Sequence, residues 1–332
     1  MLGAEPMTIS PQDLLFEVAC VACRAPSIAN SQPWLWRIDG DVLELRCDQS
    51  RQLPVADPHG QLMVTSCGAL LHHASVALAA LGAAATIERV DDPSDPALLA
   101  RLVLTGSRRV SAEDMRMHHA LRIRRTDRRP FRGIRPLPDA IVDLLRQSAV
   151  PFEVSTHVFD PAEIGLLGHA AQAAAHIHAK SDSYREEMAA WTTYRDPAQR
   201  DGVPPTAAVP QVPRPVPVRD FAPDSVPLLE PGPGDDRYTT YLALATDTDT
   251  RWDWLRTGEA VSAMLLTATT LGIASSVLSE VVEVPGARAL LRAVVAPAEF
   301  PQLTVRFGLN ASGGELRPTA RRPCSEVITI VR

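Results

Sequence analysis

The sequence contains a faint internal repeat. Residues 77–82 read ALAALG and residues 267–272 read TATTLG, a shift of 190 positions. Similarly, RLVLTG at 101–106 resembles QLTVRFG at 302–308. Small residues and helix-ending glycines are common, so chance similarity is the alternative explanation. Because the order is the same in both copies, the repeat favours a chain built as two tandem halves.

Short-range patterns predict the same elements in each half. Apolar residues three and four apart predict a helix over 67–81 and another over 260–271, each followed by a glycine. Strands are expected later, at 102–104 and 303–307.

The N-terminal region has its own predicted elements. A helix is expected over 11–24, and Pro26 ends it. Two alternating runs follow at 35–38 and 42–47. The Asp39-Gly40 pair that starts the connection between them predicts a hairpin with a type I′ turn.

Size and charge narrow the classes of function. With 332 residues, of which 45% are hydrophobic and 22% charged, the chain is long enough for about two domains. The net charge of -6 argues against a nucleic-acid or membrane-surface role, because such partners are polyanionic. Without a long apolar run or a signal-peptide plan, the expected compartment is the cytoplasm. The five scattered cysteines are expected to be reduced thiols.

A proline-rich segment separates the halves. Residues 195–235 carry eleven of the 29 prolines. Proline removes backbone donors and resists helix and central strand, so an extended loop is expected. Such a loop is either a lid over a binding site or a linker, and the sequence leaves both open.

Two further segments could bind a ligand. The turn 26–34 (PSIANSQPW) concentrates hydroxyls, amides and backbone donors that suit a polar, planar heterocycle, although an ordinary proline-bracketed turn explains it too. The segment 122–131 offers five arginines and a threonine that could hold a phosphate, but it could equally be a solvated charged face. A second basic group, Arg317, Arg321 and Arg322, lies near the C-terminus.

Other chemistry lacks its usual motifs. Cys20 and Cys23 have redox or zinc spacing, but without a second pair they are interpreted as core packing. The histidine pairs lack ligand spacing, so no metal site is assigned. P-loop, Rossmann and nucleophile-elbow motifs are absent from the sequence.

Together these segments resemble the nitroreductase superfamily of FMN proteins, and specifically its mycobacterial dormancy-associated, Acg-type branch. The 26–34 turn looks like the family's flavin-contacting turn, and 124–128 (RRTDR) resembles the Arg-x-Ser/Thr-x-Lys/Arg phosphate motif. Residues 271–280 are similar to the segment that passes the flavin N5 side, and 321–323 to a C-terminal phosphate clamp. The resemblance implies FMN as the cofactor, bound by Arg24, Pro26, Ser27, Asn30, Gln32, Arg124, Arg125, Thr126, Arg128, Leu278, Ser279, Arg321 and Arg322.

One departure from the family pattern bears on the fold. The phosphate motif normally precedes the Pro-Ser turn, whereas here it follows it. Ordinary members are homodimers with flavin at the interface, so one half of a fused pair can keep the turn and the other the arginines. The resemblance therefore implies an α+β, nitroreductase-like fold. Its halves, 1–110 and 111–332, would form an intramolecular pseudo-dimer around antiparallel-rich sheets, with one FMN and a lid at about 195–235.

Two functions are compatible with such a site. The first is NAD(P)H-dependent reduction of nitroaromatic or quinone acceptors, which needs an open flavin face. The alternative is an FMN storage or sequestering protein whose lid covers the ring. Hydride transfer at the flavin N5 needs no acid or base from the protein, so no catalytic side chain is assigned. The expected assembly is a monomeric pseudo-dimer or a weak homodimer.

Overall fold

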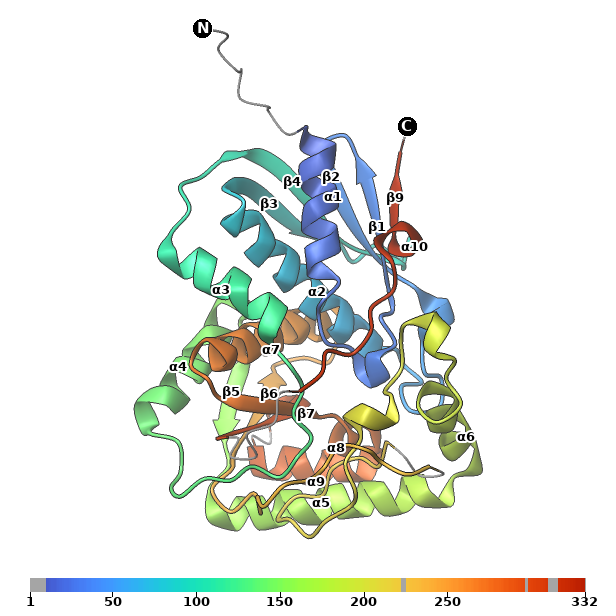
Figure 1. The fold of residues 1–332 in the computed structure, drawn as a ribbon, viewed down its shortest axis with the longest axis vertical. Coiled ribbons are helices and arrows are strands. Elements are labelled where there is room, and N and C mark those ends of the chain that lie inside the picture. Colours follow the sequence, from blue (N-terminus) through green and yellow to red (C-terminus); the bar gives the residue numbers. More distant parts are fainter. Residues whose placement is uncertain (1–9, 222–224, 296–297, 310–315, 332) are drawn as a thin grey trace, which may run out of the picture.

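Two sheets with the same order of their first four strands lie in opposite halves of the molecule (Figure 1). The computed structural model describes residues 10–221, 225–295, 298–309 and 316–331; residues 222–224 of the predicted lid lie outside the described residues. The first sheet has the order β3-β4-β2-β1-β9 and the second β5-β6-β8-β7. The strands of the first sheet are β1 (Trp34–Asp39), β2 (Val42–Cys47), β3 (Ala83–Arg89), β4 (Leu98–Ser107) and β9 (Ile328–Ile330). The strands of the second sheet are β5 (Ser155–Val158), β6 (Thr240–Thr246), β7 (Ala274–Leu278) and β8 (Phe300–Gly308).

Within each half, the first, second, third and fourth strands are arranged identically, and every pairing among them is antiparallel. The last strand, β9, leaves the second half and pairs in parallel with β1. The α+β, pseudo-dimeric architecture expected from the sequence is confirmed.

The two longest helices of the repeat occupy the middle of the molecule. Helices α2 (Gln61–Ala80) and α7 (Arg251–Thr270) are displaced in sequence by the 190 positions of the repeat, at both ends. By length and composition α2 alone among the described helices could cross a membrane, but 83% of its apolar 18-residue window is buried, as in a core helix. The others are α1 (Pro11–Ala22), α3 (Ala112–Ile123), α4 (Asp139–Ala149), α5 (Pro161–Lys180), α6 (Asp182–Trp191), α8 (Glu280–Glu283), α9 (Pro285–Val295) and α10 (Cys324–Val327).

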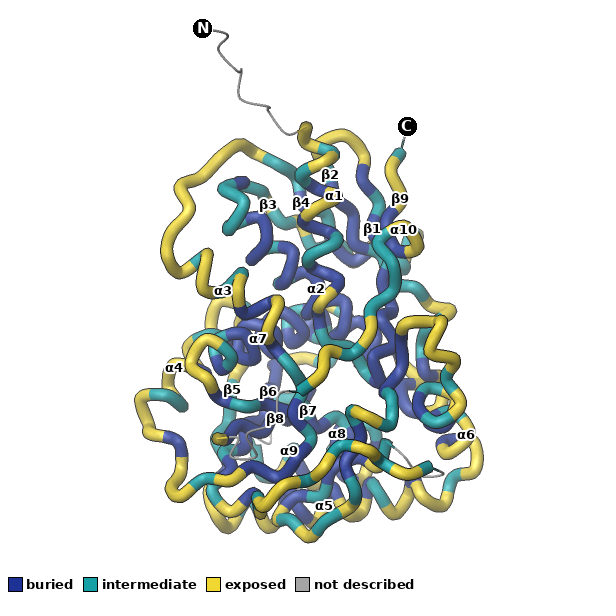
Figure 2. The backbone as a smooth tube through the Cα atoms, viewed as in Figure 1, coloured by how far each residue is buried: buried dark blue, intermediate teal, exposed yellow. Residues whose placement is uncertain are grey.

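Each sheet has its own hydrophobic core. Leu15, Trp36 and Leu70 belong to the core of the first half, and Leu145 and Leu244 to that of the second. In Figure 2 the dark blue, buried segments accordingly run through both ends and along the two central helices. This packing leaves the boundary between the halves as the place where a ligand can lie.

The helices predicted from local patterns are present, but they are longer at their N-terminal ends than predicted. Helices α2 and α7 begin six and nine residues earlier than expected, so apolar spacing alone did not locate their first turns. Side chains cap these turns instead: Asp57 accepts from the Met63 amide at 2.8 Å, and Thr250 forms a capping box with Asp253.

The predicted hairpin is present, but its turn is not type I′. Strands β1 and β2 pair with Asp39 opposite Val42, which leaves Gly40 and Asp41 as the loop. Gly40 has φ +61°, whereas Asp41 is not among the residues with positive φ. Since type I′ needs positive φ at both positions, the single glycine fits a type II′ turn.

The expectation of reduced thiols is wrong for one pair. Cys20 on α1 and Cys324 at the start of α10 form a disulfide, with 5.5 Å between their Cα atoms. Cys23, Cys47 and Cys67 are free and buried. The sequence could not reveal the pair because 304 residues separate its members.

Candidate functional site

Two adjoining cavities lie between the halves. The apolar cavity encloses about 970 Å³, including its open mouth, and is lined by the 26–29 turn, α2, α7, residues 276–281 and residues 216–221 of the proline-rich segment. The arginine cavity encloses about 800 Å³ on the same basis. The two cavities share four lining residues: Pro26, Ser27, Thr126 and Arg128. They therefore form one elongated site with an apolar end and a basic end.

The turn that separates the cavities has a strained backbone. Ala29, Asn30 and Gln32 adopt φ values of 45°, 54° and 51°, a region that residues other than glycine rarely occupy. Local hydrogen bonds compensate: the Ser27 hydroxyl accepts from the Gln32 amide at 3.0 Å, and Ser66 on α2 accepts from the Ile28 amide at 3.1 Å. Strain of this kind is concentrated at binding sites.

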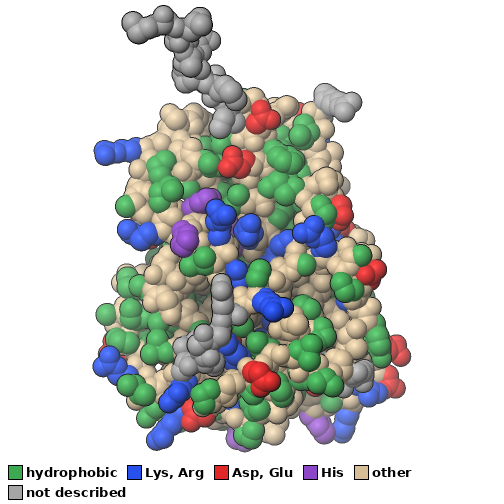
Figure 3. Space-filling model, in the orientation of Figure 1, with side chains coloured by type: hydrophobic (Ala, Val, Ile, Leu, Met, Phe, Trp, Pro, Cys, Tyr) green, Lys and Arg blue, Asp and Glu red, His purple; other side chains and the backbone are tan. Residues whose placement is uncertain are grey.

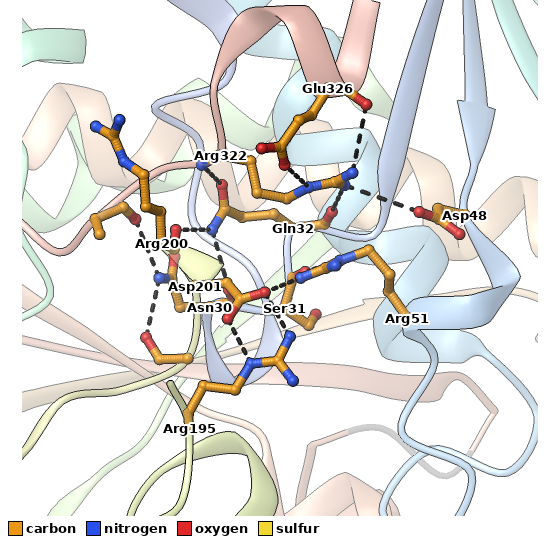
Figure 4. Close-up of polar contacts among 12 residues, drawn as sticks. Asn30, Ser31, Gln32, Asp48, Arg51, Arg195, Arg200, Asp201, Arg322 and Glu326 are labelled. Carbon is orange, nitrogen blue, oxygen red and sulfur yellow. Dashed lines mark hydrogen bonds and ion pairs between the residues drawn. The ribbon is translucent and has the colours of Figure 1, made fainter. Parts of the chain in front are cut away.

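The amide side chains of this turn hold neighbouring segments (Figure 4). Asn30 donates to the Gly202 carbonyl at 3.0 Å and to the Ala320 carbonyl at 3.2 Å. Gln32 donates to the Arg200 carbonyl at 3.0 Å and accepts from the Arg322 amide at 2.9 Å. The turn is thus the point where the proline-rich segment and the C-terminal segment meet.

A buried carboxylate fastens the proline-rich segment nearby. Asp201 accepts from Arg195 at 2.5 and 2.7 Å, and Arg51 from the first half also pairs with it (Figure 4). Burial alone would raise the pKa of Asp201, but these two guanidinium groups hold it below its usual value. Asp201 therefore stays ionised and links the proline-rich segment to the first half.

The arginine cavity is lined by many positively charged side chains. Among the described residues that line it, seven are arginines and none is acidic. Figure 3 shows Lys and Arg side chains gathered across the middle of this face. In a chain of net charge -6, this local excess indicates an anion site.

Two of these arginines are deeply placed without a carboxylate partner among the described residues. Arg321 donates to the Cys23, Arg24 and Ala25 carbonyls and to the Asn30 side chain. Arg124 is 6% exposed; it donates to Thr126 at 3.5 Å, and its Nε has no partner among the described residues. Burial, followed by the neighbouring arginine charges, lowers the pKa of Arg124 to about 9. Burial also lowers the pKa of Arg321 to about 10. Two such groups at one cavity favour an anionic ligand there.

The apolar cavity has two further arginines at its edge. Arg128 lies over the Phe221 ring at 4.4 Å and donates to the Ala207 carbonyl at 3.2 Å. Arg219, from the proline-rich segment, donates to the Ser279 hydroxyl at 3.1 Å and pairs with Glu283. Both contacts join the proline-rich segment to other parts of the second half.

The structure brings eleven of the thirteen sequence-predicted residues to the cavities. Pro26, Ser27, Thr126 and Arg128 line both; Leu278 and Ser279 line the apolar cavity; Arg24, Asn30, Arg124, Arg125 and Arg321 line the arginine cavity. Gln32 and Arg322 line neither. Their side chains face the Arg200 carbonyl and the Asp48 and Glu326 carboxylates instead.

Sequence reasoning missed the lining residues that come from the proline-rich segment. Arg219 and Phe221 stand alone in a stretch of prolines and valines, where no motif marks them. Their position at the cavity depends on where the loop folds back, which short-range patterns do not specify.

The 190-residue shift relates the site to an equivalent position elsewhere in the molecule, and side chains fill that position. Ala69 and Ser279 line the apolar cavity, and their counterparts are Glu259 and Arg89. Arg89 forms a bidentate ion pair with Glu259 at 2.7 and 2.9 Å, and Glu259 is 1% exposed. Charged side chains thus occupy the place that would correspond to a second apolar cavity.

Comparison with known proteins gives a consistent result. No protein-family model matches the chain. It is 33% identical to "Putative NAD(P)H nitroreductase acg" of Mycobacterium tuberculosis over 98% of each chain. It is also 37% identical to "Putative NAD(P)H nitroreductase Rv3131" of the same organism, over 94% of this chain and 90% of the relative. A solved structure described as a "putative nitroreductase" from Anabaena variabilis is similar in fold, with a TM-score of 0.50 and 9% identity over 92% of this chain and 90% of that one.

Proposed function

This chain belongs to the Acg-type branch of the nitroreductase superfamily, and from its two cavities we propose that it binds one FMN and transfers electrons from NAD(P)H to a nitroaromatic or quinone acceptor. The observation that carries the proposal is the pair Arg124 and Arg321. Arg124 is buried and Arg321 is partly buried, and neither guanidinium group has a carboxylate partner among the described residues, so their positive charge suits a phosphate dianion.

The proposed arrangement places the phosphate in the arginine cavity and the ring in the apolar cavity. Ser27 and Thr126 line both cavities, so they would lie beside the chain that connects ring and phosphate. Leu278 and Ser279 would contact the ring. Arg128 would hold a positive charge between ring and phosphate, where it favours a ring that carries negative charge.

Bound FMN would supply two-electron hydride chemistry. The protein would contribute orientation, charge and the exclusion of water, and we assign no acid or base to a side chain. We further propose that the chain consists of two halves, 1–110 and 111–332. It would act as a monomeric pseudo-dimer.

The alternative function, storage or sequestration of FMN, is favoured by one observation. Residues 203–221 of the proline-rich segment line both cavities, and Arg219 and Asn30 fasten the segment to its surroundings. A segment so held would act as a lid that limits access of nicotinamide to the ring.

The first experiment tests the cofactor. The purified chain is expected to be yellow and to release FMN on denaturation. Replacement of Arg124 and Arg321 together by Ala should give colourless protein. The control is Arg116→Ala, because Arg116 is an exposed arginine of α3 paired with Glu113. A double variant that retains full FMN would refute the phosphate assignment.

The second experiment separates the two functions. NADH or NADPH is added anaerobically to the yellow protein, and bleaching of the flavin absorbance indicates an electron-transfer enzyme. A yellow, inert protein supports storage. In the storage case, Arg219→Ala should accelerate bleaching by freeing the lid. Unchanged, near-zero bleaching in that variant would contradict the lid assignment.

A further inference from the structure

The Cys20–Cys324 pair lies beside the proposed phosphate site. Cys20 is near the end of α1, and Cys324 follows Arg321 by three positions at the start of α10. Both side chains belong to partly exposed residues, in contrast to the other three cysteines, which are buried. The pair is therefore the cysteine site that reagents in solution can reach most directly.

The disulfide joins the same two segments that Arg321 joins. The Arg321 guanidinium donates to the Cys23, Arg24 and Ala25 carbonyls at 3.0 to 3.1 Å, which directly follow α1. Its NH1 also donates to the Asn30 side chain at 2.9 Å. Arg321 can keep these contacts only while the C-terminal segment stays against the end of α1.

The C-terminal segment that carries Arg321 is held by two short elements of secondary structure. Strand β9 comprises three residues and α10 comprises four. Additional backbone ties are the Arg322 amide to Gln32 at 2.9 Å and the Val331 amide to Ile38 at 2.8 Å. A covalent link between Cys20 and Cys324 therefore adds to these non-covalent contacts.

We propose that Cys20 and Cys324 form a reversible thiol–disulfide modification site that controls how firmly the arginine cavity holds its phosphate ligand. This inference rests on the proposed binding of FMN. The reactant is a low-molecular-weight disulfide. One protein thiolate attacks it and releases one small thiol; the second protein thiol then displaces the other, so two protein thiols are oxidised and one disulfide is reduced to two thiols. Disulfides in reducing compartments usually serve such sensing roles.

The oxidised form keeps Arg321 in the cavity, and reduction allows the segment to leave. We expect reduction to speed FMN release by about tenfold, since the contribution of a typical disulfide exceeds the free energy that corresponds to a tenfold change in an equilibrium constant.

The test compares the oxidised and reduced full-length protein. Alkylation followed by intact mass measurement counts the reactive thiols, and the recovery of flavin fluorescence on dilution gives the FMN release rate. Cys20→Ser and Cys324→Ser should each release FMN at the rate of the reduced protein and should not respond to reductant. Cys47→Ser, at a buried free cysteine, should keep the wild-type response. Equal release rates for oxidised and reduced wild type would overturn the proposal, as would alkylation of Cys20 and Cys324 after treatment with a small disulfide.

A second measurement does not depend on FMN. Amide hydrogen exchange of residues 316–323 should be faster in reduced protein than in oxidised protein. If the protein binds no FMN but shows this difference in hydrogen exchange, the proposed function is refuted. The disulfide would then still be shown to hold the C-terminal segment. Identical exchange in both forms would refute the attachment itself.

Discussion

Gly68 on α2 and Gly258 on α7 face each other where the two central helices cross, and they are 190 positions apart in sequence. A Cβ on Gly68 would lie 2.0 Å from the Leu255 carbonyl oxygen, and one on Gly258 would lie 2.0 Å from that of Thr65. Thr65 and Leu255 are related by the same shift. The contact is therefore reciprocal, as at the two-fold axis of a homodimer.

Gly68→Ala and Gly258→Ala should each destabilise the protein by about 3 kcal/mol, because the added methyl group would force the helices apart. Urea unfolding measures the change. Gly165→Ala in α5 is the control, since its Cβ would meet nothing within 4 Å. If either variant at the crossing unfolded like the control, the close approach of the helices would be contradicted.

Arg89 and Glu259 fill the position that corresponds to the site in the other half, so we expect one FMN per chain. Absorbance of released flavin against protein concentration measures this ratio. Arg89→Ala should leave the ratio unchanged but destabilise the protein by about 3 kcal/mol, because it leaves the buried Glu259 carboxylate unpaired. Arg89→Ala combined with Glu259→Leu should recover most of that loss. A ratio of two would contradict the asymmetry of the halves.

Arg124→Met should stabilise the protein without FMN. The pKa of Arg124 is lowered to about 9, so folding disfavours its charged form at neutral pH, and this cost fades as the pH rises above that value. Removing the charge should add about 1 kcal/mol to apo stability at pH 7. FMN should stabilise wild type but not the variant. Thermal unfolding with and without FMN tests both effects, with Arg116→Met as the control.

His73→Leu should stabilise the protein more at pH 5 than at pH 7. His73 is fully buried, and neither ring nitrogen has a partner among the described residues. Burial, followed by Arg124, lowers the pKa of His73 well below its usual value. The unfolded chain therefore takes up a proton as the pH falls below about 6.5 while the folded state does not, which costs wild-type stability.

Urea midpoints at the two pH values provide the measurement. His176→Leu, at an exposed position on α5, should show no such difference between pH values. We expect the wild type to lose more stability than the His73→Leu variant between pH 7 and pH 5. An equal or smaller loss in the wild type would contradict a neutral, buried His73.

Much of the fold could be predicted from local patterns. The repeat, the hairpin and the glycines that end α2 and α7 are visible in the sequence, because each depends on neighbouring residues and on backbone freedom at glycine. The starts of α2 and α7 were missed, since side-chain caps rather than apolar spacing define them. The hairpin's turn type was also missed, because the dihedral angles of Asp41 follow from strand register rather than from composition.

The candidate site was only partly visible. The turn and the two arginine groups stand out by residue type, but Arg219 and Phe221 reach the cavity through the path of a long loop. Conversely, Gln32 and Arg322 have suitable chemistry yet face other partners.

The sequence by itself determined the periodic helices, the duplicated order and the presence of enough arginine to hold an anion. Only the tertiary structure decided that Arg124 and Arg321 lie at one cavity, that Arg89 and Glu259 fill its counterpart, and that Cys20 meets Cys324. The physical reason is that a charge acquires its function from burial and from its partners. Those partners lie across hundreds of residues and are chosen by packing, not by neighbouring positions in the chain.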